Sequence, residues 1–155
     1  MLPKNMYDVT LADAGCGFGD FYHFLEKLDM LPENYIGIDF IDEMCSIAMQ
    51  KTGQEILLAN ICKDCLPTQD YYICSGALNT LNKFDSFLFI QNCYLTSKKG
   101  FIFNVLYGDK QSQTYNYMTK EQITQIAQEL HVDEVIYETG YLDDDITVAF
   151  LKKNR

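Results

Sequence analysis

Apolar positions recur along the chain in two alternating patterns. Short runs that are almost wholly apolar predict buried strands, and glycine, proline or acidic residues bound them. Between these runs, apolar residues spaced three and four apart predict amphipathic helices. Strands that alternate with helices in this way are typical of an α/β fold with a largely parallel sheet. The expected strands cover 9–12, 35–39, 55–59, 71–74, 101–105, 132–137 and 146–151, and the expected helices cover 20–30, 41–51, 81–95 and 119–130.

The first expected strand leads into a turn with glycine at alternate positions. The strand at 9–12 ends in Asp13, and Gly15, Gly17 and Gly19 follow before the first helix. A strand, a glycine turn and a helix in this order form the first half of a nucleotide-binding βαβ unit. Glycine has no Cβ, so the backbone of such a turn can lie directly against a ligand. An ordinary glycine-rich turn is the alternative, and the strand-to-helix context favours the binding turn.

Acidic residues around the turn indicate which ligand it holds. A dinucleotide fingerprint would place its third glycine at position 20, where this chain has Asp20. Carboxylates at Asp20 and Asp13 would repel a pyrophosphate, whereas the ammonium and sulfonium groups of S-adenosylmethionine favour acidic neighbours. The second strand also ends in an acid, Asp39, which can accept hydrogen bonds from both hydroxyls of a ribose. A nicotinamide-dependent oxidoreductase is therefore the disfavoured alternative.

Two motifs together resemble the class I S-adenosylmethionine-dependent methyltransferase family. They are Asp13-Ala-Gly-Cys-Gly-Phe-Gly19 and Gly37-Ile-Asp-Phe-Ile-Asp-Glu-Met44. The resemblance implies a Rossmann-like, doubly wound, mostly parallel seven-stranded sheet with an antiparallel last strand and helices on both faces. It also implies that residues 1–155 form a single domain that binds S-adenosylmethionine.

The resemblance assigns the methionine and ribose parts of the cofactor to the first two strand ends. Asp13 would orient the methionine ammonium, and Gly15 and Gly17 would make room for the cofactor. Asp39 would hold the ribose, and the backbone carbonyl of Ser75 would accept from the ammonium. The whole expected cofactor set is Asp13, Ala14, Gly15, Cys16, Gly17, Asp39, Phe40, Asn60, Ile61 and Ser75.

The adenine would lie among residues that follow the second and third strands. The resemblance implies that Phe40 packs on the adenine and that Asn60 and Ile61 read its edge. Family members commonly have an acid where this chain has Asn60, but an asparagine side chain can still accept from the adenine amino group. An asparagine that only shapes a turn is an equally open interpretation.

The segments after the fourth and fifth strands would face the acceptor. Ser75-Gly-Ala-Leu-Asn79 lacks the Asn/Asp-Pro-Pro-Tyr box of enzymes that methylate nucleobase amines, so we expect a small-molecule acceptor. Asn79 and Tyr107 are the candidate acceptor contacts; for Asn79, a helix N-cap is the alternative. The segment 107–118 is expected to form an aromatic-lined lid, or else to carry tyrosines half-buried at the sheet edge.

Charge and composition exclude several classes of partner. The net charge is −10, and eleven of the twelve basic residues are lysines scattered along the chain. This argues against binding to nucleic acid or to an anionic membrane surface. The chain shows no signal-peptide pattern and no apolar run long enough to span a membrane, so we expect a cytoplasmic protein.

The cysteines and acid clusters do not predict a metal site. In a cytoplasmic protein the six cysteines are expected to be reduced thiols. Cys62 and Cys65 have the spacing of a zinc or redox pair, but only His23 and His131 exist as histidine ligands. A plain loop is favoured for this pair, and a solvated hairpin tip is favoured over a cation site for the acids at 143–145.

The expected activity is transfer of a methyl group to a small-molecule acceptor by in-line displacement. Neither histidine falls at a pocket motif, so no general base is evident. Only eight residues precede the first strand, where family members usually carry one or two covering helices. A homodimer or a partner chain could supply this cover. The alternative function is a non-catalytic S-adenosylmethionine-binding subunit or sensor that needs such a partner.

Overall fold

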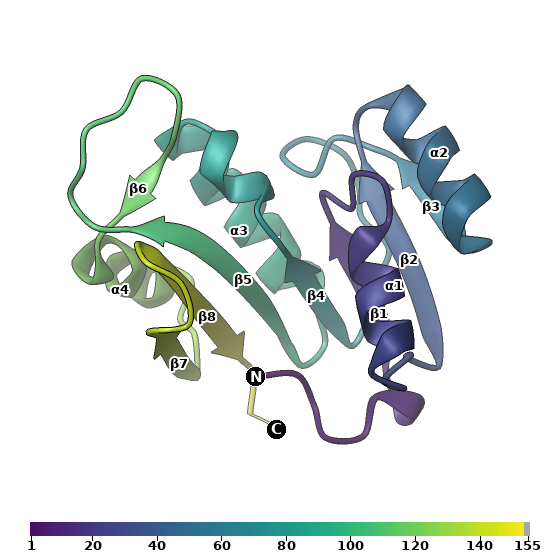
Figure 1. Cartoon of the computed structure of the whole chain (residues 1–155). Helices are drawn as coiled ribbons and strands as arrows, with labels where there is room; N and C mark the ends of the chain where they lie inside the picture. The colour runs from purple at the N-terminus through teal and green to yellow at the C-terminus, as the bar shows by residue number, and fades with distance from the viewer. Residues whose placement is uncertain (154–155) are drawn as a thin grey trace.

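The computed structural model describes residues 1–153 and has a central sheet with helices on both faces (Figure 1). The order of strands across the sheet is β3-β2-β1-β4-β5-β8-β7, and the short β6 pairs with β5. The elements in chain order are η1 (Met6–Asp8), β1 (Thr10–Ala14), α1 (Asp20–Lys27), β2 (Asn34–Asp39), α2 (Asp42–Thr52), β3 (Glu55–Leu58), β4 (Tyr71–Cys74), η2 (Ala77–Thr80), α3 (Lys83–Thr96), β5 (Gly100–Tyr107), β6 (Tyr117–Met118), α4 (Lys120–Glu129), β7 (Glu134–Thr139) and β8 (Asp145–Leu151).

The sheet topology confirms the expected doubly wound arrangement. The pairs from β3 through β2, β1 and β4 to β5 are all parallel. β8 inserts antiparallel between β5 and β7, as expected for the last strand. The strand order reverses between β1 and β4, and ligands of open α/β sheets bind in the crevice outside the carboxyl ends of strands at such a point. The topology therefore directs attention to the loops that follow β1 and β4.

Alternating side chains of the central strands build one core on each face of the sheet. Leu11, Ile73 and Ile102 are buried in a cluster with residues of α1 and α2. Their sequence neighbours Ala12 and Tyr72, among others, are buried in a second cluster with residues of α3 and α4. Successive strand residues point to opposite faces, so near-continuous apolar runs are needed where both faces are covered. The two helix layers are visible in Figure 1.

The helix boundaries differ from the expected ones by more than one residue at two places. α1 ends at Lys27 rather than near residue 30, because Asp29 takes a left-handed φ of 54° and breaks the helical geometry. α3 begins at Lys83, because the side chain of Asn82 accepts a hydrogen bond from the N–H of Asp85 and caps the helix. The helix N-cap interpretation of Asn79 is therefore wrong.

A short strand was not anticipated. β6 pairs in parallel with Leu106 and Tyr107, on the edge of β5 that β4 leaves free beyond Phe103. Two residues carry too little alternation to be recognised in a sequence. The strand ties the end of the 108–116 segment back to the sheet.

Two observations concern membrane-spanning helices and the state of the cysteines. Within residues 1–153, no helix is long and apolar enough to cross a membrane. All six cysteines are free thiols, and Cys16, Cys45, Cys74 and Cys93 are buried. The expected cytoplasmic location stays a prediction.

Candidate active site

The turn after β1 bends over the end of β2. The N–H groups of Gly15 and Cys16 both donate to the carbonyl oxygen of Ile38, at 2.8 and 3.0 Å. Gly15 and Gly17 have φ of 74° and 53°, a region that residues with a Cβ rarely adopt. A Cβ added at Gly17 would meet none of the described atoms within 4 Å. The backbone at Gly17 is therefore open to a ligand.

Asp39 at the end of β2 holds this turn in place. Its Oδ2 accepts from the N–H of Gly17 at 3.0 Å, and its Oδ1 accepts from the N–H of Ile41 at 3.1 Å. The residue is only 7% exposed. Each carboxylate oxygen has two lone pairs, so both oxygens can still accept from a ligand hydroxyl.

Asp13 at the end of β1 is a deeply buried acid. It is 1% exposed, and the hydroxyl of Tyr35 donates to its Oδ2 at 2.6 Å. Burial raises the pKa of Asp13 from 3.8 to about 7; the hydrogen bond from Tyr35 opposes this and the negative charge of Asp39 adds to it. A cation placed beside Asp13 would therefore favour the ionised form of its carboxyl group.

Two cavities meet at the glycine turn and share Gly15 and Gly17. The first, named the apolar cavity, has a volume of about 470 Å³ and is further lined by Asp39, Phe40, Ile41, Met44, Ala59, Asn60, Ile61, Cys62, Lys63, Gly76, Ala77, Thr80, Leu81, Asp85 and Phe89. The second, named the α1 cavity, has a volume of about 540 Å³ and is further lined by Asp13, Cys16, Phe18, Asp20, Phe21, Phe24 and Ser75. Both open at the carboxyl ends of parallel strands.

All the expected cofactor residues except Ala14 line one of these two cavities. Ala14 is fully buried in the core beneath them. Asn60 shapes a turn, since its Oδ1 accepts from the N–H of Cys62 at 3.0 Å, and it also lines the apolar cavity. Phe40 is 66% exposed beside this cavity.

Sequence reasoning missed the aromatic wall of the α1 cavity. Phe21, Phe24, Leu25 and Leu28 have the spacing of an apolar helix face, but Phe24 is 51% exposed and only Leu25 of these four is buried. The rings of Phe21 and Phe24 stack with centroids 6.1 Å apart, and with Phe18 they line the cavity. Helical periodicity cannot separate a ring that faces the core from one that faces a cavity.

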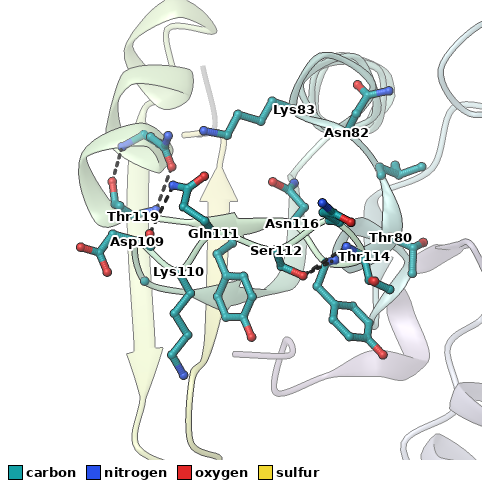
Figure 2. Close-up of a pocket in the computed structure, with 16 residues that line it drawn as sticks. Thr80, Asn82, Lys83, Asp109, Lys110, Gln111, Ser112, Thr114, Asn116 and Thr119 are labelled. Atoms are coloured by element: carbon teal, nitrogen blue, oxygen red, sulfur yellow. Dashed lines mark hydrogen bonds between the residues drawn. The ribbon is translucent and has the colours of Figure 1, made fainter.

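A third cavity, named the loop cavity, lies between the start of α3 and the segment 108–117 (Figure 2). Its volume is about 540 Å³, and it shares Thr80 and Leu81 with the apolar cavity. Its wall consists mainly of amide, hydroxyl and charged side chains, with Tyr115 and Tyr117 as the aromatic residues. The segment expected to form an aromatic-lined lid therefore presents a largely polar wall.

The two candidate acceptor contacts do not line any of these three cavities. The Oδ1 of Asn79 accepts from the N–H of Leu106 at 2.9 Å, and its carbonyl oxygen accepts from the N–H of Asn116. Tyr107 is half-buried in β5, and its N–H donates to the carbonyl oxygen of Asp144. Asn79 thus joins η2 to β5, and a contact of either residue with an acceptor stays a prediction.

The start of α1 is unsuited to a pyrophosphate. Asp20 is its first residue and lines the α1 cavity. Its carboxylate forms an exposed ion pair with Lys51 at 2.9 Å. A pyrophosphate on this helix end would lie beside the Asp20 carboxylate. The geometry therefore agrees with the expectation that this acid disfavours a dinucleotide.

No cluster of three or more potential metal ligands occurs in the described part of the chain. Cys65 is exposed, and the thiol of Cys62 donates to the carbonyl oxygen of Asp85 at 3.4 Å. Of the acids at 143–145, Asp144 pairs with Lys110, whereas Asp145 accepts hydrogen bonds from Tyr141 Oη and Asn104 Nδ2.

No protein-family model and no curated protein matches the sequence. Solved structures do resemble the fold. Magnesium protoporphyrin IX methyltransferase from Synechocystis PCC 6803, with bound S-adenosylmethionine, has a TM-score of 0.76 at 14% identity over 96% of this chain and 72% of that one. An S-adenosylmethionine-dependent methyltransferase from Mesorhizobium loti has a TM-score of 0.72 at 16% identity over 97% and 94%.

A human structure is a third example. N-acetylserotonin methyltransferase in complex with S-adenosylmethionine has a TM-score of 0.73 at 15% identity, over 94% of this chain and 48% of that chain. The likeness to each of these three structures extends over at least 94% of this chain. The chain therefore has the fold of the class I S-adenosylmethionine-dependent methyltransferases.

Proposed function

We propose that this chain is a methyltransferase that uses S-adenosylmethionine and a small-molecule acceptor. The observation that carries the proposal is the meeting of an apolar cavity and an acid-containing cavity at the open backbone of Gly17. This pairing matches a ligand with a flat, weakly polar end and a cationic end. A dinucleotide would instead need an anion site, where this chain has Asp20.

The residues of the apolar cavity suit the adenosine part. Phe40 and Ile61 offer apolar contact to a base, and Asp39 keeps lone pairs for the ribose hydroxyls. Asn60 supplies its side chain at the same wall. Because Asp39 also fixes Gly17 through a hydrogen bond, it would both bind the ribose and hold the turn in its open form.

The residues of the α1 cavity suit the methionine part. Asp13 would offer the compensating charge for an ammonium, and Ser75, whose backbone carbonyl is the proposed acceptor, lines the same cavity. The bound cofactor supplies a methyl group activated by its sulfonium. The chain must then hold donor and acceptor close together and exclude water. No base is needed where the acceptor is already ionised, and His23 on α1 is engaged with Glu26.

The structural neighbours support a small-molecule acceptor. Two of them carry such acceptors in their names, magnesium protoporphyrin IX and N-acetylserotonin. The acidic composition and scattered lysines of this chain point the same way, because they disfavour nucleic acid. The polar loop cavity, which shares Thr80 and Leu81 with the apolar cavity, and the phenylalanine-lined α1 cavity are the two places where an acceptor would enter.

The proposal is tested by isothermal titration with S-adenosylhomocysteine, the demethylated product, beside NAD. We expect micromolar binding of S-adenosylhomocysteine and none of NAD. Asp39→Ala removes the ribose acceptor and should weaken binding at least about tenfold, since a hydrogen bond to a charged group contributes about 1.5–3 kcal/mol. Glu43→Ala removes an exposed acid of the same sign from α2 and should leave the affinity unchanged. Binding of NAD without S-adenosylhomocysteine would contradict the proposal.

A non-catalytic binding subunit is the second candidate, favoured by aromatic side chains left open at the cavities. Phe24 is 51% and Phe40 is 66% exposed, which a second copy or a partner chain would cover. A chain that binds S-adenosylhomocysteine but methylates none of a panel of acids, thiols and amines until a co-purifying protein is added would support this candidate. Turnover by the isolated chain would exclude it.

A further inference from the structure

Hydrogen bonds connect a buried carboxylate on β8 with the wall of the apolar cavity. Asn104 on β5 lies between the two ends. Its Nδ2 donates to Oδ2 of Asp145 at 3.2 Å, and its Oδ1 accepts from the N–H of Gly76 at 2.8 Å. Gly76 lines the apolar cavity and Ser75 lines the α1 cavity. The carboxylate is thus linked to the junction of the two cavities without lining either of them.

Asp145, the first residue of β8, is a buried acid. It is 8% exposed, and Tyr141 Oη donates to its Oδ2 at 2.8 Å. Its Oδ1 is buried and has no hydrogen-bond partner within residues 1–153. Burying a carboxylate costs free energy that incomplete hydrogen bonding does not fully offset. The carboxylate does, however, accept from two side-chain donors, Tyr141 Oη and Asn104 Nδ2, so its removal would take away the acceptor of the Asn104 amide.

The chemistry of the link determines which way Asn104 points. The N–H of Gly76 can only donate, and the carboxylate of Asp145 can only accept. The side chain between them must therefore offer one acceptor and one donor, which is what an asparagine amide provides. The two neighbours fix the orientation of the amide, and the amide in turn fixes the position of the Gly76 N–H.

Fixing this N–H also fixes a carbonyl oxygen. The N–H of Gly76 and the C=O of Ser75 belong to one peptide unit, which is planar and trans. A rotation that frees the N–H from Asn104 would turn the Ser75 carbonyl by the same angle. Gly76 has a φ of 89°, and a Cβ added there would meet no described atom within 4 Å, so the space on that side of Gly76 is open.

We propose that Asp145 is a positioning residue of the cofactor site, acting through Asn104 on the Ser75–Gly76 peptide. The inference rests on the proposed function, because the Ser75 carbonyl is the group proposed there to accept from the methionine ammonium. Asp145 and Asn104 touch neither cofactor nor acceptor. They hold a carbonyl dipole in the orientation that a cation requires, before the cation arrives.

A swap of the two side chains tests the link. Asn104→Asp places two carboxylates against each other, so it should weaken S-adenosylhomocysteine binding about tenfold. Adding Asp145→Asn restores a donor opposite an acceptor, with the net charge of the natural chain, and should bring the affinity back to within about threefold. Asp143→Asn changes one exposed acid on the same hairpin and should leave the affinity unchanged. Each titration is made at a temperature where thermal unfolding shows that the variant is folded.

Amide hydrogen exchange of Gly76, followed by NMR in the ligand-free protein, gives a second readout. Asn104→Asp should make this amide exchange faster by about tenfold or more, and the double variant should recover the protection. A double variant no better than Asn104→Asp in both readouts, or an Asn104→Asp variant equal to the natural chain, would overturn the inference. If the natural chain binds no S-adenosylhomocysteine, the proposed function fails while the exchange of Gly76 still decides the positioning role.

Discussion

The buried carboxyl of Asp13 makes the stability of the ligand-free protein depend on pH in a defined direction. In the folded protein, burial raises its pKa from 3.8 to about 7. In the unfolded chain the group ionises near 3.8. Between these two values the unfolded state loses the proton and the folded state keeps it. Stability from this group is therefore complete below about pH 4, falls as the pH rises, and is lost above about pH 7. The full change corresponds to about 4 kcal/mol.

The substitution that isolates this effect is Asp13→Asn. Asparagine has nearly the same shape, can still accept from the Tyr35 hydroxyl, and does not ionise. The free energy of unfolding of the variant, minus that of the natural chain, should therefore rise by up to about 4 kcal/mol between pH 4 and pH 8. Urea unfolding followed by far-UV circular dichroism measures it, since the chain has no tryptophan. The difference cancels every titrating group that the two proteins share.

The same series on Asp143→Asn provides the control, because that acid is exposed on the hairpin. Its difference from the natural chain should stay nearly constant across the pH range. A constant difference for Asp13→Asn as well would refute the reasoning: Asp13 would then ionise inside the protein as easily as in water.

Two further predictions follow from the same region. A cofactor ammonium beside Asp13 would favour the ionised carboxylate, so S-adenosylhomocysteine binding at pH 6 should release protons from the natural chain and fewer from Asp13→Asn. Calorimetric titrations in two buffers with different heats of ionisation measure the number of protons released. Equal release from the two proteins would contradict a contact between the ammonium and Asp13. Gly15→Ala should destabilise the fold by roughly 2–4 kcal/mol, because its Cβ would lie 2.5 Å from that of Ala77 at a φ of 74°. Gly53→Ala has a φ of 67° but no described neighbour within 4 Å, so a thermal unfolding comparison that shows equal losses would rule out the steric part.

Local features of the sequence predicted much of the fold. Apolar runs and helical spacing depend on residues close together in the chain, and they located the seven main strands and four helices to within a few residues. Local patterns also predicted that the glycine turn and Asp39 lie close together. A parallel βα unit places the turn at Gly15 and Gly17 and the acid at one edge of the sheet. Helix ends were less accurate, since the left-handed Asp29 and the cap at Asn82 leave weak signals.

The sequence by itself therefore determined the fold class and the strand ends that carry the candidate site, because periodicity and turn chemistry are properties of neighbouring residues. Only the tertiary structure decided which side chains surround that place. It turned Phe24 toward a cavity rather than the core, and it engaged Asn79 with β5. It also brought Asp145, Asn104 and Gly76 into one hydrogen-bonded link across three segments distant in sequence. Such contacts depend on how packed elements meet, and no local pattern encodes them.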